Sequence, residues 1–411
     1  MFLVKLTKEG FMNFIIIWLC LFISVPSKAK EFSSLLKKVE GHPNIEAIRQ
    51  KFLKQSFAAE AQSSLKDPSL KFSAFNLPTP SLSFDKTPMS SKQVTLAQQI
   101  PMTSRFSHLN DQAGLLDEAG KSQVKFQVST AKANLWIVSA NIESLKKQLA
   151  IVKDSLSWMR QVDKSTQRLY STGKTNQINL LEIKVRKTEL EAQIQELAYK
   201  IEAAKSQVGY LVGEGKPTTV HSVPWHILDK KSTDNQTNDL ESSLKKQSMA
   251  ASSKLKATQL TYVPDLTVGA TYSFRENIDN QGDFVTGFVQ FSIPLWGQIG
   301  DKVSLARSEA NEQNVKFENY KLQKSKMRHS LKQKISSLLK ELDLISKSIK
   351  FSETEIKLAI KSYSLGKMGV FELLEVELRL RKKKSKKELL KENLRKSQVE
   401  LLLLQGDSLD V

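Results

Sequence analysis

Two long tracts of this chain contain no proline. None lies between Pro101 and Pro217, and none follows Pro294 in a chain of 411 residues. Proline costs about 3 kcal/mol inside a helix, so its absence permits helices much longer than those of ordinary globular domains. Both tracts are also rich in Lys, Glu, Gln, Leu and Ala. A helix from Met102 to Tyr170 would span about 100 Å at about 1.5 Å per residue.

Apolar residues recur every seven positions near the end of the first tract. One seam consists of Leu180, Lys187, Ile194, Ile201 and Val208, and its companion consists of Ile183, Leu190, Leu197, Ala204 and Leu211. All of these positions except that of Lys187 are apolar, which is the pattern of a coiled-coil seam. The long helices are therefore predicted to pack as coiled coils.

The segments that contain proline show a different period. Residues 264–295 predict a β-hairpin: two runs alternate apolar and polar residues on either side of the turn-like cluster Asn277–Gly282. A weaker hairpin is predicted at about 68–101, with a connection rich in Pro and Ser. Each strand of the stronger hairpin has about ten residues, the length that a tilted strand needs to cross a bilayer. A soluble sheet can give the same alternation, so the hairpins alone leave both environments open.

The chain repeats itself at a fixed offset. The segment Tyr170–Glu182 matches Tyr363–Glu375, and the same offset of 193 residues carries Ile100-Pro101 onto Ile293-Pro294. A single offset that holds from strand end to helix end indicates an internal duplication. We predict a first structural repeat at 30–213, a polar linker at 214–243 and a second repeat at 244–411. Each repeat is expected to run helix, strand, turn, strand, long helix, Gly-containing break, long helix.

The N-terminus predicts export. Lys5 and Lys8 precede an apolar run from Phe14 to Val25, and small residues end the segment at Ala29. This order is typical of a cleaved signal peptide at 1–29, since the apolar run is short for a membrane anchor. The only cysteine, Cys20, lies inside that run, so no disulfide framework is expected. Export also argues against nucleic acid as the partner of a chain with net charge +19.

Other signals point to no chemistry. The spacing of the histidines fits no metal signature, and no phosphate loop, nucleophile elbow or carboxylate pair is present, so we expect no enzyme activity, no cofactor and no metal site. The segment 379–387 carries seven basic residues in nine. It is interpreted either as a solvated helix face or as a patch that faces an acidic partner, peptidoglycan or lipid phosphates.

These features together resemble the TolC-like outer-membrane efflux proteins. The resemblance covers nearly the whole mature chain, and it rests on Tyr262–Ala270, on Phe291–Trp296 and on the two Tyr-x-x-Gly breaks followed by Leu-Leu. Segments 84–89 and 92–101 look most like the subgroup that serves heavy-metal pumps.

The resemblance implies a mainly α fold with membrane β-structure. Three protomers would each give four strands to one twelve-stranded barrel, and a long antiparallel coiled-coil tube would continue into the periplasm. Four strands cannot close a barrel alone, so oligomerisation would be required. Interfacial aromatics would include Phe72, Phe75, Tyr272, Phe284 and Trp296. The polar strand face, including Asp265, Thr267, Thr271, Thr286 and Gln290, would line the lumen.

The resemblance also assigns a role to the Gly-containing breaks. They would form helical tips that dock a periplasmic adaptor, at Thr172, Gly173, Lys174, Leu365, Gly366 and Lys367. Neither turn contains an acidic residue, and Asp163 and Glu372 lie outside the turns, so the residue that narrows the pore is left open.

The expected function is that of a passive outer-membrane exit duct. An inner-membrane pump and the adaptor would deliver the cargo, which would be metal ions or drugs. Type I protein secretion, a periplasmic coiled-coil scaffold without a pore, and a basic polyanion-binding protein are the alternatives.

Overall fold

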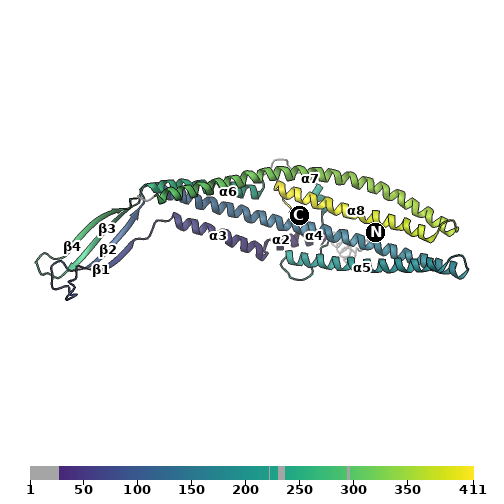
Figure 1. Cartoon of the computed structure of the whole chain (residues 1–411), viewed down its shortest axis with the longest axis horizontal. Helices are drawn as coiled ribbons and strands as arrows, with labels where there is room; N and C mark the ends of the chain where they lie inside the picture. The colour runs from purple at the N-terminus through teal and green to yellow at the C-terminus, as the bar shows by residue number, and fades with distance from the viewer. Residues whose placement is uncertain (1–26, 222, 230–236, 294–296) are drawn as a thin grey trace, which may run out of the picture. The chain divides into compact units, whose positions relative to one another are not determined.

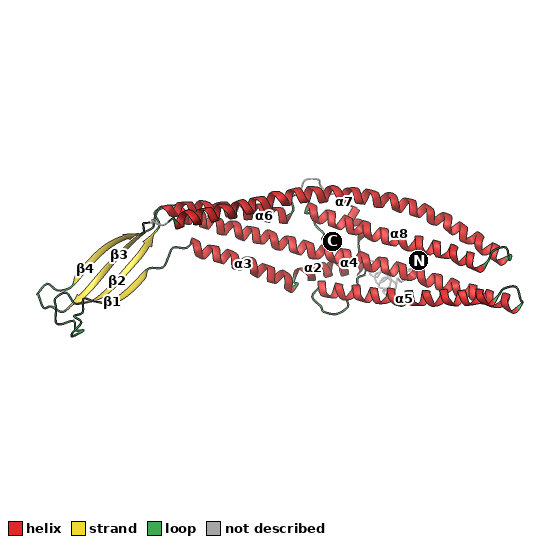
Figure 2. Cartoon of the chain, viewed as in Figure 1, coloured by secondary structure: helices red, strands yellow, loops and turns green. Residues whose placement is uncertain are grey.

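The computed structural model describes residues 27–221, 223–229, 237–293 and 297–411 (Figure 1). This part of the chain is built from long helices and one small sheet (Figure 2). Residues 1–26 of the predicted signal peptide, and the predicted aromatic Trp296, lie outside the described residues. No helix within the described ranges is long and apolar enough to cross a membrane.

The element order is similar in the two halves, but two helices precede the first hairpin where one helix was predicted. The first half contains α2 (Ser27–Glu40), α3 (Pro43–Ser63), β1 (Ser69–Phe75), β2 (Ser91–Ile100), α4 (Arg105–Ser171) and α5 (Gln177–Leu211). The short 3-10 helix η1 (Trp225–Asp229) follows. The second half contains α6 (Asp239–Gln259), the 3-10 helix η2 (Leu260–Tyr262), β3 (Leu266–Arg275), β4 (Phe284–Phe291), α7 (Gln298–Ser364) and α8 (Val370–Gln405).

Helix lengths confirm the internal symmetry. Helices α4 and α7 have 67 residues each, and both their starts and their ends are 193 positions apart. Helices α3 and α6 have 21 residues each, but their starts are 196 positions apart. The offset changes inside the hairpins because the β1–β2 connection is longer than the β3–β4 connection. Helix α6 begins at Asp239, so the last residues of the predicted linker 214–243 are helical.

The chain divides into two compact units that each draw on both repeats. One unit takes in the described parts of Met1–Glu46, Phe126–Asn238 and Lys324–Val411. The other consists of Ala47–Lys125 and Asp239–Gln323 and contains the sheet. Both boundaries on the long helices fall inside α4 and α7.

The first unit has a continuous apolar core. Its α5 seam is buried at Ile183, Leu190 and Leu197, as the seven-residue period predicts. The fully buried Trp136 packs edge-on against Phe32 with ring centroids 4.7 Å apart, and its Nε1 donates to the Leu409 carbonyl at 3.0 Å. This bond fixes the C-terminal segment to α4.

A buried charge on α4 also holds the C-terminal segment. Lys132 lies 2.6 Å from both Glu40 and Asp410. Burial alone would lower the pKa of Lys132, but the hydrogen bonds to the two carboxylates outweigh it and raise the pKa. Both ends of the described chain are therefore tied to the middle of α4.

Helices of the second unit pack through small residues. Ala119, Ala250, Ala257 and Ala306 are buried there. A Cβ on Gly120 would lie 2.8 Å from the Cβ of Phe52, so glycine allows α3 to approach α4 closely. Lys254 and Glu309 form an ion pair at 2.5 Å that joins α6 to α7.

The four strands form one antiparallel sheet in the order β1-β2-β3-β4. The four strands confirm both predicted hairpins, and β2 pairs with β3 to join them. In the described structure β1 and β4 are the edges of the sheet, and no described helix of the same unit lies over either of its faces (Figure 2).

Candidate functional site

The polar face of the sheet gathers most of the predicted lumen residues. Thr271 pairs with Thr286 across β3 and β4, and Thr267 pairs with Gln290. The hydroxyl oxygens of Thr95 and Thr271 lie 2.8 Å apart on the same face. Because side chains alternate along a strand, the continuous register places all of these groups on one side of the sheet.

The opposite face is apolar and exposed. It carries Leu70, Phe72, Leu96, Val268, Tyr272, Val285, Val289 and Phe291. Phe72 and Val285 are each 72% exposed, and Leu96 in the middle of β2 is 55% exposed. Water-soluble proteins rarely leave so large a contiguous apolar surface uncovered, so this face is suited to lipid.

Two of the predicted interfacial aromatics lie on the other face. Phe75 pairs with Ser91, and Phe284 pairs with Ser273, so both side chains belong to the polar side. The expectation was wrong for these two because an aromatic residue does not reveal its face unless its strand register is known. Phe72 and Tyr272 do lie on the apolar face.

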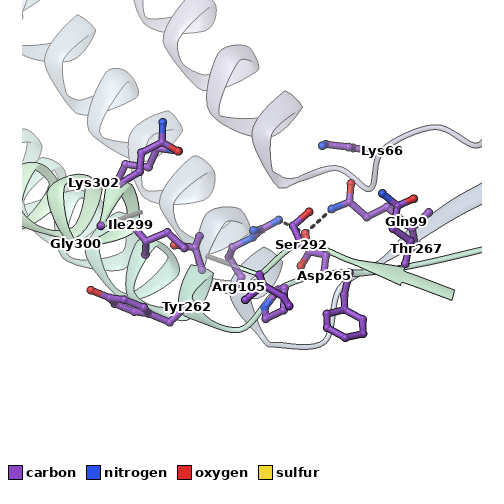
Figure 3. A pocket seen from close by; sticks show the side chains of 17 residues that line it. Lys66, Gln99, Arg105, Tyr262, Asp265, Thr267, Ser292, Ile299, Gly300 and Lys302 are labelled. Carbon is purple, nitrogen blue, oxygen red and sulfur yellow. Dashed lines mark hydrogen bonds and ion pairs between the residues drawn. The ribbon is translucent and has the colours of Figure 1, made fainter. Parts of the chain in front are cut away.

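A cavity of about 700 Å³ lies where the sheet meets the helices of its unit. In Figure 3, Gln99 and Arg105 point toward Asp265, and Lys66 borders the same space. Gln99 Nε2 and Arg105 Nη2 each donate to Asp265 Oδ2 at 2.8 Å. The side chain of Asp265 is 6% exposed. The carboxylate of Asp265, which was predicted to face the lumen, therefore forms an ion pair with Arg105. Its position in the sequence, next to β3, did not reveal this partner.

At the other end of the sheet, Arg275 joins the two hairpin connections. Its Nε donates to the Pro88 carbonyl at 2.7 Å, and its Nη2 lies 2.5 Å from Asp279. The bond from Arg275 holds the pKa of Asp279 below its ordinary value, and the backbone N–H of Arg275 does the same for Asp283. We call Arg275 with its partners Pro88, Asp279 and Asp283 the arginine clamp. It was not predicted, although the sequence shows an arginine at a strand end with aspartates four and eight positions later.

The two predicted tip turns have the same geometry. Gly173 and Gly366 adopt φ values of 70° and 68°. Lys174 N donates to the Leu169 carbonyl at 2.8 Å, and Lys367 N donates to that of Ser362 at 2.9 Å. These bonds close the C-termini of α4 and α7 as Schellman motifs, which require a left-handed residue. Thr172, Lys174 and Leu365 are also exposed, and both turns lie at one end of their unit (Figure 1).

Alanine at either turn glycine is expected to cost about 1–2 kcal/mol of unfolding free energy, because a Cβ disfavours positive φ. Gly114 provides the control, since it lies inside α4 without a positive φ and with open space around its Cβ position. Gly114→Ala should stabilise by about 0.5–1 kcal/mol. Denaturant unfolding of the three variants measures this, and equal effects at Gly114 and Gly173 would contradict the turn geometry.

Buried polar contacts tie the helices together near these turns. Thr166 donates to the Val162 carbonyl and therefore accepts from the Tyr363 hydroxyl, 2.7 Å away. Asp163 is buried and pairs with Lys187 at 3.2 Å. Glu372 is exposed. The ion pair of Asp163 therefore joins α4 to α5.

The basic segment 379–387 finds acidic partners in its own chain. Arg379 pairs with Glu355 at 2.7 Å, and Lys384 pairs with Glu353 at 2.9 Å. Lys386 pairs with Glu341 at 2.8 Å. The acidic residues lie on α7, so these pairs join α7 to α8. The heptad pattern of α8 did not show them, because the partners are about 25 to 45 positions away in sequence.

Comparisons with solved structures agree with this geometry. No protein-family model and no curated protein sequence matches the chain. The outer membrane protein VceC from Vibrio cholerae matches with a TM-score of 0.76 and 13% identity, over 92% of this chain and 97% of VceC. The CmeC outer membrane channel of Campylobacter jejuni matches with a TM-score of 0.75 and 12% identity, over 92% of this chain and 85% of CmeC.

The chain has the fold of these two outer-membrane proteins. The open-state MtrE outer membrane channel of Neisseria gonorrhoeae shares it with a TM-score of 0.64 and 13% identity, over 92% of this chain and 90% of MtrE. The predicted fold class, long helices with four strands per protomer, is confirmed. The identities are similarly low for each of the three, so they favour no subgroup.

Proposed function

We propose that this protein is the outer-membrane exit duct of a tripartite efflux system. Three copies form one barrel in the outer membrane, and their helices form a tube in the periplasm. A periplasmic adaptor joins the tube to an inner-membrane pump, which supplies the energy. The protein carries out no catalysis, and its cargo is a heavy metal or a drug that the pump selects.

The observation that carries this proposal is the two-faced sheet. One face is apolar and exposed, the other is polar, and β1 and β4 are both edges. A bilayer does not tolerate open sheet edges, so further copies of the chain must supply the missing pairing. A coiled-coil scaffold without a pore gives no reason for an exposed apolar face on a sheet whose central strands, β2 and β3, have ten residues each and are long enough to cross a bilayer.

The tip turns support docking of an adaptor. Leu365 and Phe371 are 62% and 57% exposed on the α7–α8 side, and Ile178 and Leu181 are 74% and 61% exposed on the α4–α5 side. Exposed apolar side chains around two equivalent turns are suited to contact with a protein partner.

The variant Leu365→Asp tests the docking role. We expect it to abolish resistance in the native host to the exported metal or drug, because a buried carboxylate at the adaptor contact is costly. The same variant should still form conducting pores after purification. Gly114→Ala, away from the turns, is the control for resistance. Retained resistance in Leu365→Asp would refute docking at the turn, and loss of conductance would mean that the substitution damages the duct itself.

A further inference from the structure

The polar face of the sheet carries few charges, and they are of one sign. Its charged side chains within the strands are Lys71 and Arg275. Arg275 is neutralised by Asp279 and is 5% exposed. Lys71, which lies opposite Thr95, is exposed, and none of the described carboxylates forms an ion pair with it. This face therefore presents one free cation per chain and no free carboxylate.

The cavity where the sheet meets the helices of its unit adds two more cations. It lies at the end of the polar face that is nearest to these helices. Gln99, Thr267 and Gln290 from the polar face line this cavity together with Lys66 and Lys302 (Figure 3). Both lysines are exposed, and neither has an ion-pair partner in the described structure. The one carboxylate of the lining, Asp265, is already paired with Arg105. Asp67 and Asp301 are sequence neighbours of the lysines, but neither lines the cavity.

Charges of one sign on a narrow polar surface act together. A passage with low-dielectric walls focuses their field and concentrates ions of the opposite sign. Rings of Lys or Arg are the usual origin of anion preference in pores. If several copies enclose one lumen, each copy contributes one Lys66, one Lys71 and one Lys302. Each of these lysines then forms a ring around the lumen.

We propose that the duct favours anions, and that Lys66, Lys71 and Lys302 set this preference. The proposal rests on the proposed function, because it requires the polar face to line a lumen. The favoured cargo is a negatively charged species, such as an anionic drug or an anionic metal complex. Free metal cations gain nothing from this surface.

Ion selectivity of the purified full chain in planar lipid bilayers tests the proposal. Reversal potentials are measured across a KCl gradient at low ionic strength, because salt of about 0.1 M already screens charges beyond about 10 Å. We expect wild-type pores to pass Cl⁻ more readily than K⁺. Lys66→Gln/Lys71→Gln/Lys302→Gln should lower the permeability ratio of Cl⁻ to K⁺ by about twofold or more.

Lys92→Gln is the matched control. Lys92 lies in the same sheet but on the apolar face, where it pairs with Ala74 and Phe274. The single variant Lys71→Gln, one exposed side chain, guards against a folding defect in the triple variant. A cation-selective wild type, a triple variant with unchanged selectivity, or an equal change in Lys92→Gln would overturn the charge proposal and leave the duct standing. Absence of conductance in every form would refute the duct itself.

Discussion

Leu96→Lys is expected to cost about 2–4 kcal/mol of folding free energy in a bilayer for each copy of the chain. Leu96 lies in the middle of β2 on the exposed apolar face, paired with Leu70 and Ala270. Lipid cannot solvate an ammonium group there, so the chain should fail to insert or should lose its oligomer. The fraction folded after refolding into lipid vesicles measures the loss.

Thr95→Lys provides the matched control on the next residue of the same strand. Thr95 lies on the polar face, and its replacement removes the contact with Thr271 at 2.8 Å. The loss of that hydrogen bond should cost about 1 kcal/mol. The new charge should add little to this cost, because the proposed duct exposes this face to water. Equal insertion of the two lysine variants would show that the apolar face does not meet lipid.

Trp136→Ala is expected to destabilise the protein by about 3–5 kcal/mol. The indole of Trp136 is fully buried, and it contacts Phe32 and Trp225 with ring centroids 4.7 and 5.7 Å away. Removal leaves a cavity between segments from both ends of the described chain. The free energy of unfolding in denaturant should fall, and the C-terminal segment should become sensitive to protease.

Trp136→Phe separates packing from hydrogen bonding at the same site. Phenylalanine keeps most of the ring contacts but loses the Nε1 donor that reaches Leu409 at 3.0 Å. We expect a loss of about 1–2 kcal/mol. If alanine and phenylalanine were equally harmful, the hydrogen bond would dominate and the cavity argument would fail.

Features set by local pattern could be predicted from the sequence. The alternation of apolar and polar residues predicted the four strands, since successive side chains along a strand point to opposite faces of the sheet. The matching Tyr-x-x-Gly segments predicted the turns at Gly173 and Gly366, because a left-handed helix end strongly favours glycine. The fixed offset of 193 residues predicted that α4 and α7 have matching ends.

Features that depend on partners distant in sequence could not be predicted. The carboxylate of Asp265 pairs with Arg105, 160 positions away, and Arg275 reaches Pro88, 187 positions away. The faces of Phe75 and Phe284 follow from strand register, which pairing fixes and composition does not. Local periodicity contains no information on such contacts. The cavity between the sheet and the helices, and the contacts of Arg275 at the other end of the sheet, could therefore be found only in the structure.

Electron microscopy of the detergent-extracted protein tests the central claim most directly. The proposed duct predicts a three-fold tube longer than about 100 Å, with a detergent belt around one end. A monomer, or a soluble rod without a belt, would contradict the assignment of the apolar face to lipid and would favour a scaffold without a pore.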